Sequence, residues 1–402
     1  MNTRTMLGLA AATTAAFGIA APASAQKVVD FPGHTPMVTK IGQQGGSLIE
    51  NQFVCAFARG AVSRANVRAA ANRAANAHGG QVFITYNNTF QGFAVRMSPQ
   101  GIAQMQSRNP DIAYCEQDRA VALAPPSDRG PKDKGGGGGS EPTEEVPPGI
   151  AFVLDDAAPA AYTGGGRAFV VDTGVDLTHP DLNVSQNFAL HKSYITSGND
   201  TSANDQNGHG THVAGTIAAR LGNNIGVVGV APGAEVVSIR VLDRNGRGSC
   251  STITDAIDEL DGVVRPDDVV NMSLGCPTFT SLDTAVTTLA GKGIRFAIAA
   301  GNDGRDADDS SPARTGDAAN VYTIAALDTS YTKLTSWSNY GAAVDYAEPG
   351  ASIKSTWKNG GYNTISGTSM AAPHMAGLLL LGAIKSGGNA TGTGGPYVIG
   401  IN

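Results

Sequence analysis

The chain has 402 residues, of which 41% are hydrophobic and 15% are charged, and its formal net charge is −6. This length suffices for two domains, and the 52 glycines follow no G-x-y period, so a collagen-like fold is excluded. Residues 26–145 carry 12 basic and 10 acidic side chains, whereas residues 146–402 carry 15 and 24. The acidic second part argues against nucleic acid as a partner and is compatible with calcium.

Residues 1–25 predict a secretory signal peptide. Arg4 supplies a charged start, Met6 to Ala20 form a mostly apolar run, and Ala23 and Ala25 form a small-residue cleavage pattern. A membrane anchor is the alternative, but this run of 15 residues is shorter than the roughly 20 that span a bilayer. We therefore expect cleavage after Ala25, an extracellular or periplasmic location, and no membrane association.

Export would permit disulfides. The chain has four cysteines, which allow three pairings at this stage: Cys55, Cys115, Cys250 and Cys276.

Residues 26–124 predict a small α+β domain. The expected strands are QFVCAFA, QVFITY, GFAVRM and DIAYCE. Ser63 and Ser98 are N-cap candidates for two intervening helices, Gly79 ends the first helix, and Pro99 lies in the first turn of the second. The order β-α-β-β-α-β is typical of a ferredoxin-like sandwich.

Residues 125–145 contain the run GGGGGS and no periodicity, which predicts a flexible spacer, with an expression remnant as the alternative interpretation. Residues 146–402 contain the apolar runs AFVVD, EVVSIRVL, VVNMSLG, RFAIAAG and VYTIAA, separated by helix-like stretches. This pattern predicts an α/β domain with a parallel sheet covered by helices on both faces. Such sheets place their functional sites at the carboxyl ends of strands.

Three polar residues follow such strands or begin helices. VVDTGVD contains Asp172, NGHGTHVAGT contains His209, and SGTSMAAPHMAG contains Ser369. Taken singly, they could be an Asx turn, a structural histidine and a helix cap. Taken together they form a nucleophile, a base and an orienting carboxylate, which is the set that an activated serine needs.

Two other chemistries are disfavoured. A zinc site at His209 and His212 would lack the H-E-x-x-H pattern. Ser369 lies in G-T-S-M-A rather than in G-x-S-x-G, and the order Asp-His-Ser differs from that of α/β-hydrolases.

With these motifs, the chain resembles the subtilisin-like serine proteases (subtilases), near the proteinase K branch. Residues 149–384 resemble the catalytic domain, and residues 51–123 resemble the subtilisin propeptide inhibitor through HGGQVFITYNNTFQGFAVRM and IAYCEQDRAV. The resemblance implies that Ser369 attacks the scissile carbonyl, that His209 acts as base and then as acid, and that Asp172 orients His209.

The resemblance also implies an oxyanion hole and a substrate cleft. Asn302, in AIAAGNDG, would donate to the oxyanion together with the N–H of Ser369, and the alternative is a turn residue. Two edge strands would hold an extended peptide, and small residues would wall the primary pocket. The edge residues are Gly246, Arg247, Gly248, Ser273, Leu274 and Gly275, and the wall residues are Ala299, Ala300 and Gly301.

Structural calcium is a further implication, although no cofactor is expected for the chemistry. One site would use Asp181, Leu221, Asn223, Ile225 and Val227, and a second would use Asp345 with carbonyls near Ala319 and Val321. A metal-free, glycine-rich loop is the alternative.

The family's biology implies polypeptide substrates, a monomer, and a propeptide that inhibits the enzyme until self-cleavage removes it. Because a disulfide across the spacer would keep a cut propeptide attached, we expect the pairs Cys55–Cys115 and Cys250–Cys276. The second bond would lie at the rim of a distal substrate pocket and influence preference there; two free buried thiols are the alternative.

The chain departs from the family pattern in three places. Pro148 stands where this branch commonly has tryptophan, the spacer is longer than usual, and only 33 residues follow Ser369. The leading interpretation is a secreted endopeptidase made as an inactive precursor. A catalytically silent binding protein is the runner-up, but the complete triad disfavours it. A processing protease of narrow specificity is the third interpretation.

Overall fold

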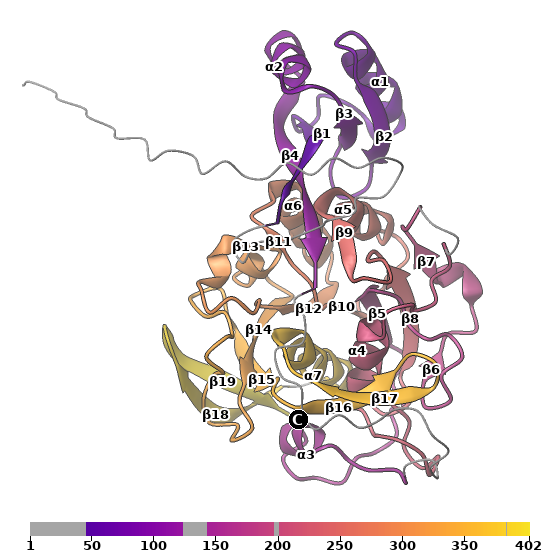
Figure 1. Cartoon of the computed structure of the whole chain (residues 1–402), viewed down its shortest axis with the longest axis vertical. Helices are drawn as coiled ribbons and strands as arrows, with labels where there is room; N and C mark the ends of the chain where they lie inside the picture. The colour runs from indigo at the N-terminus through magenta and orange to yellow at the C-terminus, as the bar shows by residue number, and fades with distance from the viewer. Residues whose placement is uncertain (1–45, 124–142, 197–200, 383) are drawn as a thin grey trace, which may run out of the picture.

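The computed structural model describes residues 46–123, 143–196, 201–382 and 384–402. The small domain (residues 46–123) sits at one end of the large domain (residues 143–402), as Figure 1 shows. The expected signal peptide and most of the expected spacer lie outside the described residues. Within the described ranges, the helices are all too short or too polar to cross a bilayer.

The small domain has the element order expected from the sequence. Its elements are β1 (Leu48–Phe57), α1 (Val67–Asn76), β2 (Gln81–Tyr86), β3 (Gly92–Arg96), α2 (Pro99–Arg108) and β4 (Ile112–Ala122). The four strands form an antiparallel sheet in the order β2-β3-β1-β4, and the Cys55–Cys115 disulfide joins β1 to β4. Phe53, Phe93 and Met105 belong to a buried cluster between this sheet and its helices, so the small domain has a core of its own.

One expected helix cap is correct and the other is wrong. Ser98 accepts a hydrogen bond from the N–H of Gly101 and begins α2 as expected. Ser63 precedes a short 3-10 turn, η1 (Arg64–Asn66), and its side chain makes no capping bond. Because this turn intervenes, α1 begins only at Val67, beyond the reach of the Ser63 hydroxyl.

The large domain is built around a ten-stranded sheet in the order β18-β19-β15-β14-β12-β10-β5-β8-β6, with β7 also on β8. Every pair is parallel except β18–β19. The strands are β5 (Arg167–Asp172), β6 (Asn183–Val184), β7 (Lys192–Ser193), β8 (Glu235–Arg240), β10 (Val269–Met272), β12 (Arg295–Ala299), β14 (Val321–Leu327), β15 (Tyr346–Pro349), β18 (Lys385–Gly392) and β19 (Gly395–Ile401).

Helices cover both faces of this sheet. One buried cluster joins the strands to α4 (His209–Ala218) and α7 (Thr368–Leu381), and the other joins them to α5 (Cys250–Glu259) and α6 (Thr280–Ala290). This arrangement confirms the predicted α/β class. The remaining elements are α3 (Pro148–Val153), η2 (Phe188–Leu190), η3 (Ala307–Asp309), η4 (Ala313–Thr315), and the hairpin β16 (Ile353–Trp357) with β17 (Gly361–Ile365).

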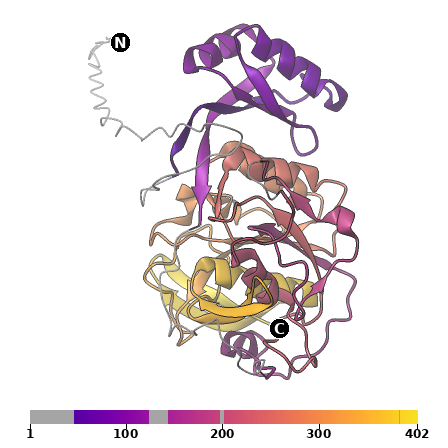
Figure 2. The same ribbon diagram turned by 45° about the vertical axis from the view of Figure 1, so that its right-hand side comes forward.

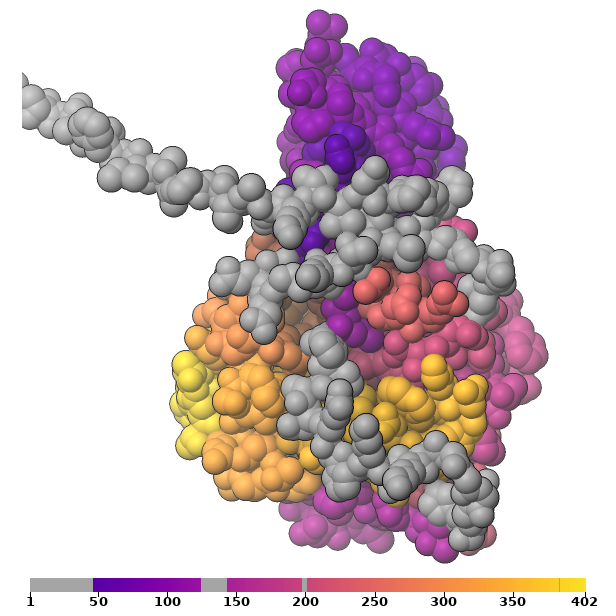
Figure 3. Space-filling model, in the orientation of Figure 1, coloured from indigo at the N-terminus to yellow at the C-terminus, as the bar shows by residue number. Residues whose placement is uncertain are grey.

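Two short strands make further connections: β9 (Arg247–Ser249) links the large domain to the small domain, and β11 (Cys276–Pro277) is linked to α5. β9 pairs antiparallel with β4, so the small domain's sheet continues into the large domain. Figure 2 shows β4 descending from the small domain onto the large domain, and Figure 3 shows the small domain covering one end of the large one. β11 pairs with β13 (Ser310–Ser311), and the Cys250–Cys276 disulfide joins β11 to α5. Both disulfides have the pairing expected above.

Candidate active site

The expected base and its expected carboxylate meet at one edge of the sheet. β5 ends at Asp172 and α4 begins at His209. The Nδ1 atom of His209 lies 2.8 Å from Oδ1 and 3.0 Å from Oδ2 of Asp172, whose side chain is fully buried. An Nδ1–H that donates to Asp172 leaves Nε2 as the proton acceptor, which is the tautomer that a general base requires.

A glycine beside the histidine permits this approach. A Cβ atom at Gly210 would lie 2.0 Å from the carbonyl oxygen of Gly174, so only glycine lets α4 come this close to the end of β5. The glycines around His209 in the sequence therefore have a steric origin.

The environment of His209 favours its protonated form. Burial lowers the pKa of His209, but the nearby carboxylate of Asp172 outweighs burial, so the pKa is raised above its usual value. Asp205 adds a smaller contribution of the same sign. This arrangement stabilises the imidazolium that forms when the histidine accepts a proton.

Asp205 was missed by the sequence reasoning. Its buried carboxylate accepts hydrogen bonds from the hydroxyl of Thr173, from the backbone N–H groups of Asn207 and Gly208, and from both the N–H and the hydroxyl of Thr211. It therefore fastens the first turn of α4 to the end of β5. An aspartate just ahead of a helix start is a capping signal that could have identified it.

Ser369 lies near the start of α7 and is 8% exposed. Its hydroxyl donates to the carbonyl oxygen of Ser273 over 3.1 Å. Among the described residues it makes no hydrogen bond to His209, so the hydroxyl must rotate to reach the base. Nucleophile–base contacts are often loose before substrate binds.

Two donors converge beside Ser369. The Oδ1 atom of Asn302 accepts from the N–H and the hydroxyl of Thr368, so its amide nitrogen turns the other way. A Cβ atom at Gly367 would lie 3.6 Å from the nitrogen of Ser369 and 3.7 Å from Nδ2 of Asn302. Both nitrogens therefore lie within 4 Å of one point beside Gly367, which agrees with the pair of donors that an oxyanion hole requires. Thr368, which orients Asn302, carried no signal in the sequence.

The expected cleft residues surround a cavity of about 250 Å³. Its lining includes Ser273, Leu274, Gly275, Ala299, Ala300, Gly301, Asn302 and Ser369, together with residues 120–123 of the small domain. The structure thus brings the expected pocket walls and one expected edge together with the serine.

The other expected edge, Gly246–Gly248, already holds a strand. Val121 lies opposite Gly248 and Ala122 lies opposite Arg247 in an antiparallel register. The N–H of Leu123 then donates to the carbonyl oxygen of Gly246 over 2.9 Å. The chain's own small domain therefore runs along the cleft as an extended peptide.

His212 has a different environment from His209. Its Nε2 atom lies 2.9 Å from the carbonyl oxygen of Ile353, and burial lowers the pKa of His212 to about 3. It is a neutral histidine inside the domain. Within the described ranges, no three His, Cys, Asp or Glu side chains gather in a way that could hold a metal ion.

The first expected calcium site is assembled around Asp181. Its carboxylate accepts from Nδ2 of Asn223, from the N–H of Val227 and from the hydroxyl of Tyr362. Leu221 and Ile225 lie in the same loop. Carbonyl, amide and carboxylate oxygens suit calcium. The three hydrogen bonds to the Asp181 carboxylate would have to break before that carboxylate could bind the ion.

Glu144 and Glu145, which the sequence analysis assigns to the spacer, contact this loop. Glu144 Oε2 accepts from the backbone N–H groups of Gly222, Asn223 and Asn224, and Glu145 forms a β-bridge with Val227.

The second expected calcium site centres on Asp345. Burial and the neighbouring charge of Asp317 raise the pKa of Asp345 to about 7. Its Oδ2 atom accepts from the N–H of Thr323, and Val321 begins the adjacent strand. A half-buried carboxylate with an acidic neighbour is stabilised by a hard cation, so the donor chemistry agrees with calcium.

Comparisons with known proteins agree with this geometry. Residues 169–389 match the profile described as "Subtilase family". The chain is 36% identical over 302 residues to alkaline serine exoprotease A of Vibrio alginolyticus, covering 75% of this chain and 53% of that protein. It is 42% identical over 228 residues to the thermophilic serine proteinase of Bacillus sp. (strain AK1), covering 56% and 54%. The chain thus spans about half the length of these two relatives.

A solved structure described as a cold adapted subtilisin-like serine proteinase has a similar fold. The TM-score is 0.52 and the identity is 34%, over 62% of this chain and 96% of that chain.

Proposed function

Because the chain belongs to the subtilase family, we propose that it is a secreted serine endopeptidase made as an inactive precursor. The observation that carries the proposal is the His209–Asp172 pair, together with the Asn302 and Ser369 nitrogens that lie near one another at Gly367. Each of these groups has a defined task in acyl transfer, and all three motifs of the triad are present.

The proposed mechanism begins when the Ser369 hydroxyl turns from Ser273 toward His209. The serine oxygen attacks the scissile carbonyl while Nε2 of His209 takes its proton. The resulting oxyanion accepts hydrogen bonds from the N–H of Ser369 and the amide of Asn302. His209 then gives its proton to the amine as the C–N bond breaks, which leaves an acyl-enzyme on Ser369. A water molecule, with His209 again as the base, attacks this acyl group and releases it, and His209 returns the proton to Ser369. Asp172 holds the tautomer throughout.

We further propose that residues 26–124 form a propeptide that inhibits the enzyme. The antiparallel pairing of Val121 and Ala122 with β9 supports this role, because an extended peptide substrate would need the same edge. Self-cleavage at the end of this strand or in the spacer would free the strand to leave. A signal peptide at residues 1–25 would direct export.

Calcium would contribute stability rather than chemistry. Asp345 and carbonyls near Ala319 and Val321 would hold one ion, and Asp181 with its loop is the second candidate. A bound cation would stabilise the folded state by preferential binding.

A serine-directed phosphonofluoridate tests the proposed function. The purified protein, after its spacer has been cut, should hydrolyse a peptide substrate and lose this activity as one label attaches to Ser369, as located by peptide mass spectrometry. A matched control is Ser366→Ala, which removes a neighbouring hydroxyl that bonds the N–H of Ser352. The control should keep both activity and labelling. An active protein labelled at another serine would contradict the proposal.

A further inference from the structure

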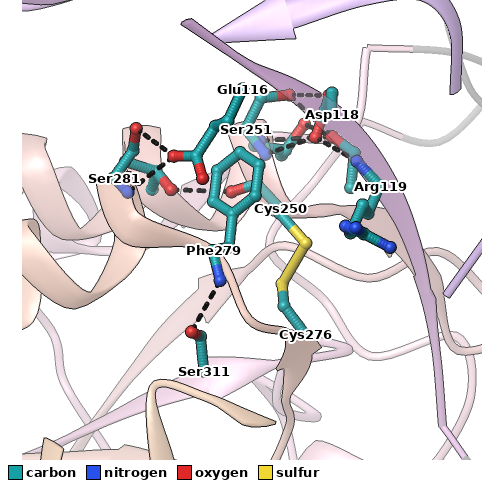
Figure 4. Close-up of a disulfide and its surroundings, with 12 residues drawn as sticks. Glu116, Asp118, Arg119, Cys250, Ser251, Cys276, Phe279, Ser281 and Ser311 are labelled. Atoms are coloured by element: carbon teal, nitrogen blue, oxygen red, sulfur yellow. Dashed lines mark hydrogen bonds between the residues drawn. A yellow bond between two sulfur atoms is a disulfide. The ribbon is translucent and has the colours of Figure 1, made fainter. Parts of the chain in front are cut away.

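One strand of the small domain supplies carboxylates to the starts of two helices. Oε1 of Glu116 accepts from the N–H of Ser281 at 2.7 Å and from its hydroxyl at 2.6 Å, while Oε2 accepts from the N–H of Thr280 at 2.9 Å. Two residues further along β4, Oδ1 of Asp118 accepts from the N–H of Ser251 at 3.0 Å. Thr280 begins α6, and Ser251 is the second residue of α5 (Figure 4).

Glu116 provides the cap that α6 lacks, and the buried Asp118 requires polar partners. The N-cap residue of α6 is Phe279, which has no side-chain oxygen and makes no capping bond. Glu116 therefore satisfies N–H groups that α6 cannot satisfy itself. Asp118 is fully buried and makes no ion pair among the described residues, so its charge depends on N–H, hydroxyl and amide donors, including the start of α5.

The two helix starts are tied together by a disulfide. Cys250 is the first residue of α5, next to Ser251, and Cys276 lies four residues before Thr280. Both cysteines are buried. Figure 4 shows their disulfide below Glu116 and Asp118 of β4. Alternate residues of a strand are roughly 6.7 Å apart, so Glu116 and Asp118 can reach both helix starts only if these keep a matching spacing.

We propose that the Cys250–Cys276 disulfide sets this spacing and so builds a docking surface for an extended strand with carboxylates two residues apart. The small domain is the occupant seen here, through the sequence Glu-Gln-Asp at residues 116–118. The inference rests on the proposed role of that domain as an inhibitory propeptide. It adds that the disulfide governs how tightly the inhibitor is held.

The same disulfide could act by a different route. Val121 belongs to the apolar cluster that includes Leu274, Cys250 and Cys276. Loss of the bond could then weaken docking through this pocket alone, without the two carboxylates. The experiment must separate these two routes.

A third carboxylate provides a matched control. Asp258 of α5 accepts hydrogen bonds from the backbone N–H groups of Asn87, Asn88 and Thr89 in the small domain. It lies eight residues after Cys250, which is about 12 Å along the helix. Its contribution to docking should therefore be independent of the disulfide.

The test measures docking without catalysis. The full chain carries Ser369→Ala and a recognition sequence for an added site-specific protease within residues 130–140, so that the spacer can be cut on demand. The dissociation constant of the two pieces is then measured by dilution and size-exclusion chromatography. Cys250→Ser with Cys276→Ser should weaken docking by about tenfold or more.

The decisive comparison is a double-mutant cycle. In a chain with Glu116→Gln and Asp118→Asn, loss of the disulfide should change the dissociation constant by less than about twofold. In a chain with Asp258→Asn, loss of the disulfide should keep its full effect. An equal effect in all three backgrounds, or no effect in the otherwise unchanged chain, would overturn the proposal.

The result can be interpreted even if the double serine variant does not fold or if the chain has no peptidase activity. If the double serine variant does not fold, as judged by its melting curve, selective reduction and alkylation of Cys250 and Cys276 in the folded, cut chain repeats the comparison. Because docking is measured on the Ser369→Ala chain, its result does not depend on peptidase activity. An inactive chain with Ser369 would count against the proposed function, whereas the docking cycle alone decides the role of the disulfide.

Discussion

The N–H of Leu123 and the carbonyl oxygen of Gly246 form a hydrogen bond of 2.9 Å, which joins the last described residue of the small domain to the edge of the cleft. The preceding residues of β4 pair with β9 and lead the chain to this point. The small domain thus ends in the cleft itself, where Leu123 lines the same cavity as Ser369.

This position predicts where maturation occurs. We expect the first cut between Arg119 and Glu145, with Leu123–Ala124 as the favoured bond, because residues 120–123 lie in the cleft beside Ser369. Sequencing the N-terminus of the mature enzyme measures this directly. An N-terminus before Gln91 would leave β4 attached to the mature enzyme, and it would contradict the proposal that β4 is removed with the small domain.

Ser369→Ala should leave a folded precursor that keeps its small domain. Loss of the nucleophile lowers turnover by about 10⁶-fold in subtilisin, and a similar loss would prevent self-cleavage here. Gel electrophoresis of the purified chain over several days provides the measurement. Efficient maturation of this variant at high dilution would remove Ser369 from the proposed role.

Asn302→Leu should lower kcat by about 10²–10³-fold and leave KM nearly unchanged. The amide nitrogen of Asn302 shares its space with the N–H of Ser369, where charge develops only in the transition state. Steady-state kinetics on a short peptide separates kcat from KM. Asn389→Leu, at an exposed position in β18, serves to show that loss of an amide alone is tolerated. A change confined to KM would assign Asn302 to substrate binding instead.

The pH dependence of hydrolysis should reflect the raised pKa of His209. The base must be neutral, so activity should fall as the pH drops through this raised pKa, which lies above the ordinary value of about 6.5. Asp172→Asn removes the charge that raises the pKa, so the acid limb should move to lower pH while kcat drops by about 10⁴-fold. A profile of kcat/KM between pH 4 and 10 tests both effects. An unmoved acid limb would show that another group controls it.

Removal of calcium should lower the melting temperature of the mature enzyme. An ion present at about 100 times its Kd contributes about 2.7 kcal/mol, which corresponds to roughly 5–10 °C for a domain of this size. Differential scanning calorimetry with and without excess chelator provides the comparison. Asp345→Asn should reduce the response, whereas Asp308→Asn, at an exposed position in η3, should not. Identical melting curves with and without chelator would dismiss structural calcium.

The parts of the structure that local sequence determines were predictable. The glycines on either side of His209 are steric requirements, so this motif identifies part of the site before any coordinates do. The hydrophobic runs likewise predicted the parallel sheet, because buried strands need apolar side chains on both faces.

The remaining features depend on residues that are distant in the chain. Glu116 caps a helix that begins 164 residues later, and Asp258 binds a turn that lies 171 residues earlier. No local pattern distinguishes such carboxylates from solvated ones. The error at Ser63 has a similar cause, because a serine followed by a 3-10 turn looks like a helix cap until the geometry of the turn is known.

The proposed use of β9 by both the small domain and substrates would constrain how this protein can evolve. A substitution that reshapes the edge from Gly246 to Gly248 would then alter both the preference for substrates and the binding of residues 120–123. Under the proposed function, a protein that comes to cleave a wider range of peptides would have to change its small domain as well, or it would lose inhibition of its active site. Substitutions at Val121 should accordingly covary with substitutions in the cleft. A chimera that carries the small domain of a diverged relative should therefore be inhibited less strongly than either parent.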